Sequence, residues 1–173
     1  IDVGAGGALF TSGGAVTQSG TISSGQLRVT ADSAGTAQDI TLELANAALG
    51  NISLYGASVE FNNTGLAAGV TTIQNVTATG TLDVASDVNI FSSGNIDVTG
   101  AASFTTTGDA VVVGYGAGAF DAASVNVDTT VGGASASVVR ITDVDAVELG
   151  AISASELTVV ADGAVTQTGD ISA

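Results

Sequence analysis

A short motif that returns along the chain constrains the fold more than any other feature of the sequence. It consists of a glycine, one variable residue and an isoleucine or leucine, followed after a short spacer by apolar residues in alternate positions. The motif begins at Gly20, Gly50, Gly80, Gly94, Gly150 and Gly169. The steps between the first three glycines are each 30 residues long, and the later steps are irregular. Repetition of this kind indicates a protein built from stacked structural units.

The apolar residues of the motif alternate with other residues, which is the pattern of β-strands. Clear examples are Ile52/Leu54, Leu82/Val84, Val111/Val113 and Val125/Val127. Strands of three to five residues are not stable alone, but they can stack in parallel around a narrow core. We therefore expect an all-β chain that forms a right-handed parallel β-helix, or β-solenoid, with about seven rungs of irregular length.

A longer recurrence joins the two ends of the chain. Residues 14–24 have the sequence GAVTQSGTISS and residues 163–173 have GAVTQTGDISA, so that eight of eleven positions are identical at an offset of 149. Either one type of rung returns, or the sequence covers slightly more than one copy of a long tandem repeat. Residues 1–173 are interpreted as a single solenoid segment of a larger repetitive protein. No signal-peptide pattern follows Ile1, so any secretion signal is expected to lie outside this segment.

The alternative fold is an immunoglobulin-like β-sandwich, whose strands are also short and alternating. The sequence has no tryptophan for a sandwich core and no proline for its loops. The spacing between the apolar pairs is also often shorter than a sandwich needs. The absence of proline suits a chain whose backbone N–H groups nearly all donate to strand ladders. These observations favour the solenoid over the sandwich.

Charge and composition exclude several classes of function. There are 17 acidic residues and two basic ones, Arg28 and Arg140, which gives a net charge of −15. Such a chain repels nucleic acid and anionic membrane surfaces, and no apolar run is long enough for insertion into a membrane. Histidine, cysteine and lysine are absent. A Ser-His-Asp triad, a His/Cys zinc site and a P-loop are therefore excluded, and we expect a protein that is not an enzyme.

Several phrases resemble the repeats of filamentous-haemagglutinin-like large exoproteins of bacteria. They are Ala15–Gly20, Val147–Ala154 and Leu157–Gly169. The resemblance is loose along the chain and tightest near its ends. It implies a β-helix secreted to the bacterial cell surface, with a role in adhesion, aggregation or biofilm formation. It carries no catalytic residues and no ligand.

Two sets of residues are candidate sites. Asp143 and Asp145 lie on one side of a predicted strand and offer the oxygen ligands that calcium prefers, although outward, solvated strand positions are the simpler interpretation. Tyr115 and Phe120 flank a glycine-rich stretch that could form a contact loop. No cofactor other than calcium is expected.

The sequence favours a structural stalk or fibre segment that associates end to end, or that continues within one giant chain. The alternative is an adhesion module whose loop at Tyr115 and Phe120 binds glycans or proteins of a host or neighbouring cell. A polysaccharide-cleaving β-helix enzyme that uses paired carboxylates is a third hypothesis.

Overall fold

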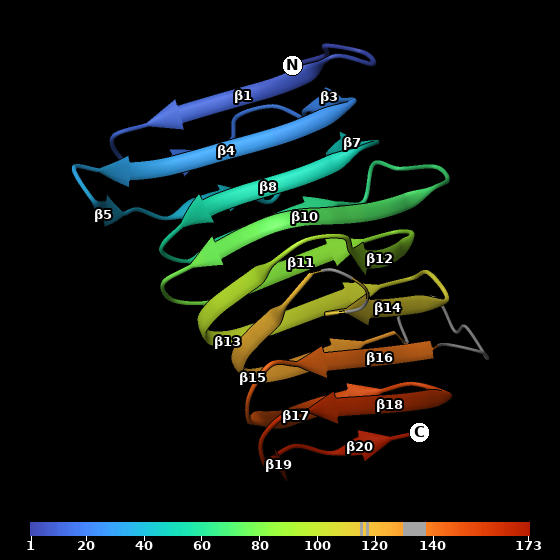
Figure 1. Ribbon diagram of the computed structural model, residues 1–173. Coiled ribbons are helices and arrows are strands. Elements are labelled where there is room, and N and C mark those ends of the chain that lie inside the picture. Colours follow the sequence, from blue (N-terminus) through green and yellow to red (C-terminus); the bar gives the residue numbers. More distant parts are fainter. Residues whose placement is uncertain (115, 117, 130–137) are drawn as a thin grey trace.

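The computed structural model describes residues 1–114, 116, 118–129 and 138–173. Within these residues the chain is all β, and parallel strands stack into a β-solenoid of about 7 turns. Figure 1 shows the stack running from the N-terminal strand β1 (Gly7–Ser12) to the C-terminal strand β20 (Ile171–Ser172). No helix long and apolar enough to span a membrane occurs in the part of the chain that the structure describes. The expected parallel β-solenoid is confirmed.

One face of the solenoid, here called the front ladder, is a column of parallel strands that faces the viewer in Figure 1. Its strands, in order of stacking, are β1, β4 (Gln26–Ser33), β8 (Asn51–Gly56), β10 (Val70–Ala78), β12 (Asn89–Ser92), β14 (Ala110–Val113), β16 (Val138–Asp143) and β18 (Glu156–Ala161). Each strand between β1 and β18 pairs with the strand before it and the strand after it, which satisfies the backbone polar groups of the interior rungs.

A second column, the rear ladder, closes the other side of the core. It contains β2 (Val16–Thr17), β6 (Ile40–Leu42), β9 (Val59–Asn63), β11 (Leu82–Ser86), β13 (Ile96–Thr106), β15 (Phe120–Asp128), β17 (Val147–Ser153), β19 (Val165–Gln167) and β20. The long strand β13 begins beside β10 in the front ladder and continues beside β11 in the rear ladder, so it turns a corner of the solenoid.

Three short strands complete the list. Strand β3 (Ser23–Ser24) pairs in parallel with β7 (Ala47–Ala48) and forms a small third side near the N-terminus. Strand β5 (Thr36–Ala37) folds back on β4, and this is the one antiparallel pair among the described strands. An immunoglobulin-like sandwich would require antiparallel strands in two facing sheets. The sandwich alternative is therefore wrong.

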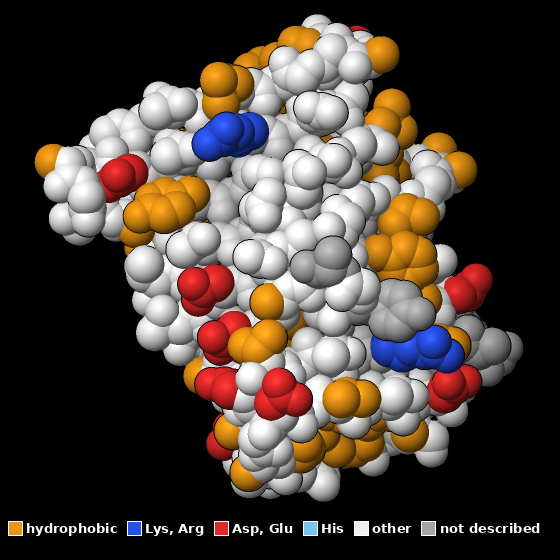
Figure 2. Space-filling view, viewed as in Figure 1, with side chains coloured by type: hydrophobic (Ala, Val, Ile, Leu, Met, Phe, Trp, Pro, Cys, Tyr) orange, Lys and Arg blue, Asp and Glu red, His pale blue; other side chains and the backbone are white. Residues whose placement is uncertain are grey.

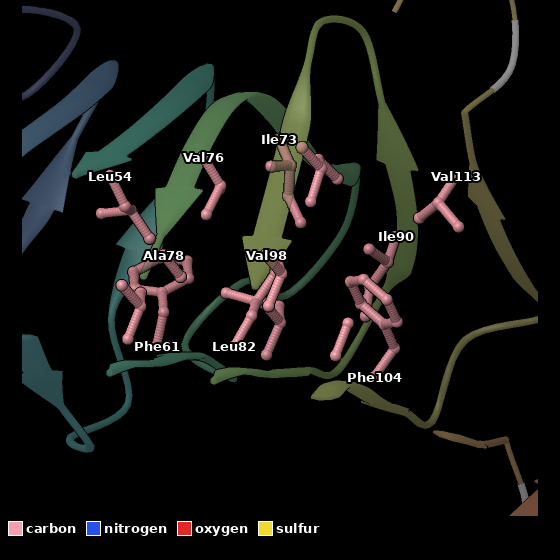
Figure 3. Packing of buried hydrophobic residues seen from close by; sticks show 14 of the residues in the cluster. Leu54, Phe61, Ile73, Val76, Ala78, Leu82, Ile90, Val98, Phe104 and Val113 are labelled. Carbon is pink, nitrogen blue, oxygen red and sulfur yellow. The ribbon is translucent and has the colours of Figure 1, made fainter. Parts of the chain in front are cut away.

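The core consists of columns of side chains that stack from rung to rung. One column in the rear ladder contains Leu42, Phe61, Val84, Phe104, Val127 and Ile152. Each of these side chains is at most 2% exposed, and Figure 3 shows several of the buried side chains pointing into the space between the ladders. Alternate residues point inward because strand side chains have a period of two, so the apolar pairs of the sequence become the core.

Two of the motif glycines, Gly50 and Gly94, allow stacked turns to approach closely. A Cβ atom at Gly50 would collide with the backbone carbonyl oxygen of Gly25, and one at Gly94 would collide with that of Gln74. Neither glycine has a positive φ. Glycine is needed at these two positions because a neighbouring backbone occupies the space of a side chain.

Hydrogen-bonded side chains join the rungs at one corner of the interior. The amide Nδ2 of Asn63 donates to Thr71 Oγ1 over 2.9 Å, and Thr71 Oγ1 lies 2.7 Å from Ser86 Oγ. All three residues are buried. Because each polar group has a partner, the corner can be buried without a large penalty.

Candidate functional site

Asp143 occupies an inward position of the core. It is the last residue of β16, where it pairs with Phe120 of the preceding rung and with Ala161 of the next. The preceding members of its column are Phe10, Val29, Leu54, Val76, Ile96 and Phe120. Only 2% of Asp143 is exposed. The interpretation of Asp143 as a solvated, outward residue is therefore wrong, because its carboxyl group stands where six other rungs place an apolar side chain.

The carboxyl group of Asp143 is only partly satisfied. Its Oδ1 accepts a hydrogen bond from the backbone N–H of Asp145 over 3.0 Å, whereas its Oδ2 has no hydrogen-bond partner among the described residues. Burial raises the pKa of Asp143, and the neighbouring carboxylate of Asp145 adds to this effect. The backbone N–H of Asp145 acts in the opposite direction, and the resulting pKa is about 6. Burial thus favours a protonated Asp143.

A column of carboxylates lies on the outer surface beside Asp143. Asp97 and Asp121 are register partners on β13 and β15. Burial raises the pKa of Asp121, and the charges of Asp145 and Asp97 raise it further. Figure 2 shows acidic side chains gathered at the lower left of the front face, toward the C-terminal rungs. The two predicted calcium ligands thus stand at the edge of a strongly negative surface.

The prediction that Asp143 and Asp145 lie on one side of a strand is wrong. Strand β16 ends at Asp143, whose side chain is buried, and Asp145 lies exposed in the bend that follows. In the described part of the chain no three Asp, Glu, His or Cys residues are grouped so that they could hold a metal ion. Calcium takes six to eight oxygen ligands, so an ion here would need backbone carbonyl groups and water in addition to these carboxylates. Calcium binding at Asp143 and Asp145 remains a prediction.

The structure tests the predicted contact loop at Phe120 but not at Tyr115. Tyr115 lies outside the described residues. Phe120 is 0% exposed, and its ring packs against Phe104 with ring centroids 6.3 Å apart. The prediction that Phe120 contacts a ligand is therefore wrong, because the ring belongs to the core of the solenoid.

The last rung, formed by β18, β19 and β20, has an incomplete core. Val139, Ile141 and Val147 of the preceding rung are at most 1% exposed. Their partners in the last rung are Leu157, Val159 and Val165. Leu157 and Val159 are only partly buried, and Val165 is 49% exposed. The last rung therefore presents an open apolar edge, here called the C-terminal edge.

The recurrence between residues 14–24 and 163–173 is a recurrence of structure. In each copy the glutamine Nε2 donates to the carbonyl oxygen of the glycine two residues later. The distance is 2.8 Å for Gln18 to Gly20 and 2.8 Å for Gln167 to Gly169. The N-terminal copy is covered by the next rung, whose Asn46 side chain hydrogen-bonds to Gln18. The C-terminal copy forms the C-terminal edge, where the described chain supplies no further rung.

A groove of about 630 Å³ crosses the outer surface of β1, β4, β8 and β10. Arg28, Tyr55, Asn51 and Asn75 are among the residues that line it. The groove is not among the sites predicted from the sequence. Arg28 pairs with Ser53, an offset of 25 residues, whereas the motifs at Gly20 and Gly50 are 30 residues apart. The spacing of the motifs therefore does not give the register that places Arg28 and Tyr55 on one face.

The fold defines the chain as a repeat protein of the parallel β-solenoid class. A family model described as repeats of unknown function (DUF5649) matches residues 1–55, 61–128 and 135–173. The chain belongs to this family. Neither a curated protein nor a solved structure matches the chain.

The comparisons support the resemblance seen in the sequence only in part. They establish a repeat family, and the structure establishes the solenoid, but nothing in the comparisons ties the chain to filamentous-haemagglutinin repeats in particular. Adhesion, secretion and biofilm formation therefore do not follow from family membership.

Proposed function

We propose that this chain is a structural segment of a rod or fibre on the outside of a bacterial cell. The single observation that carries the proposal is the C-terminal edge, which repeats a rung that is covered elsewhere in the same molecule. An open strand edge above a partly buried apolar core is a template for further strands.

The recurrence indicates what covers the edge. The N-terminal copy, residues 14–24, is covered by β6 and the turn that contains Asn46. Residues 163–173 have nearly the same sequence, so a rung similar to residues 40–48 fits beneath them. Such a rung would belong either to a further repeat of the same chain or to a second copy of the protein. Both arrangements lengthen the solenoid along its axis.

The composition supports a mechanical role rather than a catalytic one. The chain has no histidine, cysteine or lysine, so several of the usual general bases and nucleophiles are missing. Continuous parallel ladders make a stiff rod, because each interior rung is hydrogen-bonded to two neighbours. A net charge of −15 keeps the sides of such rods apart, so association at the ends is favoured over association at the sides. The proposed location outside the cell rests on the resemblance to large exoproteins alone.

End-to-end association can be tested with a pair of substitutions in one strand. Val159 points into the open core of the last rung, whereas its neighbour Val160 is 52% exposed on the outer surface. We expect the wild-type chain to form linear assemblies as its concentration rises. Val159→Asp should abolish them, because it places a charge on the apolar edge. Sedimentation velocity and negative-stain electron microscopy measure the assemblies.

Val160→Asp is the matched control, since it adds the same charge one residue away on the solvated face. It should leave assembly nearly unchanged. Wild-type chains that stay single at millimolar concentration, or a Val160→Asp variant as impaired as Val159→Asp, would contradict end-to-end stacking.

A further inference from the structure

The groove on the front ladder is hollow because a small side chain lies at its centre. Leu9, Arg28, Ser53 and Asn75 are register partners on four successive strands. Ser53 is the smallest of the four, and the larger side chains stand on both sides of it. Tyr55 lies two residues farther along β8 on the same face. The volume of about 630 Å³ is within the usual range for binding sites of small ligands.

A β-bulge widens the polar side of the groove. The pairing of β10 with β8 shifts register between Ile73 and Asn75. A bulge re-aims side chains, and here both Gln74 and Asn75 line the groove. Together with Asn51 and Gln26 they supply four side-chain amides, each of which can donate and accept hydrogen bonds.

The charge of the groove is opposite to the charge of the chain. No carboxylate is among the described residues that line it, although the chain has 17 acidic residues. Arg28 is largely exposed there and has no ion pair in the described part of the chain. The other arginine, Arg140, lies 3.4 Å from Glu156.

We propose that this groove binds an oligosaccharide that carries a carboxylate, such as a chain of uronic acid residues. The Arg28 guanidinium pairs with the sugar carboxylate, for which its planar fork of donors is well suited. The amides of Asn51, Gln74 and Asn75 hydrogen-bond to hydroxyl groups. The Tyr55 ring offers a flat apolar surface to one face of a sugar ring while its hydroxyl stays in water.

The observations favour a saccharide over an acidic peptide or a nucleic acid. A peptide gains affinity on a sheet by pairing with a free strand edge, but each strand in the middle of this groove is paired on both sides. Nucleic acid needs several cations to offset its phosphates, and the groove has one. The acidic residues outside the groove do not prevent binding of a short anion, since the Debye length at physiological ionic strength is about 8 Å.

The experiment compares the two arginines of the chain. Binding of a galacturonic acid hexamer to the full chain is measured by isothermal titration calorimetry and by NMR shift changes. Arg28→Gln should weaken binding by about tenfold or more, because it removes a charge-assisted hydrogen bond. Arg140→Gln removes the same charge from the same protein and should change affinity by less than about twofold. Shift changes should map to β4, β8 and β10.

Two further probes complete the test. Maltohexaose, a chain of six glucose residues, has the hydroxyl groups without the carboxylate and should bind about tenfold more weakly than the acidic hexamer. A glutamic acid hexapeptide has the carboxylates without the hydroxyl groups and should not bind. Equal binding of the two sugars, equal effects of the two arginine variants, preference for the peptide, or no binding of the acidic hexamer would overturn the proposal.

This inference does not depend on end-to-end stacking. The groove lies on the first four strands of the front ladder, and the C-terminal edge lies on the last rung. The same titrations on the Val159→Asp variant should give the wild-type affinity. The binding proposal and the proposed structural function can thus fail separately.

Discussion

The rung formed by β16 and β17 and the last rung, formed by β18, β19 and β20, follow similar paths but differ in burial. In the first, Val139 and Ile141 are 0% exposed. In the second, their partners Leu157 and Val159 are only partly buried. The residue types are nearly the same, so the difference comes from the number of neighbouring rungs. Burial in a solenoid is supplied by the neighbours on both sides.

The comparison also separates strand formation from hydrophobic burial, which occur together in the core of a globular protein. A strand in this chain can form because of its alternating sequence, as β18 does, and still gain little hydrophobic stabilisation. The energetic importance of a residue is therefore set by the position of its rung in the stack as well as by its residue type.

The largest expected effect is the truncation of a central aromatic residue. Phe104→Ala should lower the free energy of unfolding by about 3–5 kcal/mol, because the cavity lies in a rung that is covered on both sides. Val165→Ala, at 49% exposure in the last rung, should cost less than about 1 kcal/mol. Urea denaturation followed by circular dichroism measures both, and similar losses would mean that the last rung is already covered in solution.

A smaller effect is expected at the motif glycines. A Cβ at Gly50 would collide with the Gly25 backbone, whereas nothing lies within 4 Å of a Cβ at Gly20. Gly50→Ala should therefore destabilise the fold by about 1–3 kcal/mol through overpacking. Gly20→Ala should stay within about 0.5 kcal/mol of the wild type. Equal thermal shifts for the two variants would mean that the glycines serve local flexibility rather than the approach of adjacent turns.

Most of the architecture could be predicted from the sequence because it depends on local patterns. The alternating pairs mark inward positions, and motif glycines such as Gly50 and Gly94 mark turns that approach a neighbouring backbone. The return of strand β5 on β4 was not predicted. It turns at Ala34 and Gly35, both with positive φ, and an alanine gives no sequence signal for that conformation.

The candidate sites were harder to predict because each depends on more than one rung. The alternation Val139, Ile141, Asp143 does place Asp143 inward, but an acidic residue at the end of a strand suggests the surface. The burial of Phe120 follows from its register with Ile96, which the irregular rung lengths conceal. The groove at Arg28 requires the alignment of four strands and a bulge that changes which amides face it.

The buried carboxyl group of Asp143 predicts that the stability of the fold depends on pH. The pKa of Asp143 is about 6 in the folded chain and has an ordinary value of 3.8. Folding thus favours the protonated form of Asp143. The contribution of this group to the stability of the folded chain is fully present below about pH 4 and is lost as the pH rises through about 6. Because asparagine cannot ionise, Asp143→Asn should reduce the decline in stability with rising pH. It should raise the melting temperature at pH 7 by roughly 2–4 °C.

Asp162 is the matched control for this measurement, since it is exposed in the last rung. Asp162→Asn makes the same chemical change at an exposed position and should change the melting temperature at pH 7 by less than about 1 °C. The pKa values of Glu60, Asp83 and Asp121 are raised as well, so a smaller decline in stability with pH should remain in the Asp143→Asn variant. A melting profile of Asp143→Asn that superimposes on the wild type would show that the carboxyl group is solvated in solution.

The smallest expected effect is that of calcium at Asp143 and Asp145. An ion equal in concentration to its dissociation constant stabilises the folded chain by about 0.4 kcal/mol. Binding requires ionised carboxylates, so the stabilisation should grow as the pH rises through about 6, in the direction opposite to the protonation effect. Differential scanning calorimetry with calcium and with a chelator measures it. Asp143→Asn combined with Asp145→Asn should abolish the shift while Asp162→Asn retains it, and a shift that survives the double substitution would assign calcium to the acidic surface as a whole.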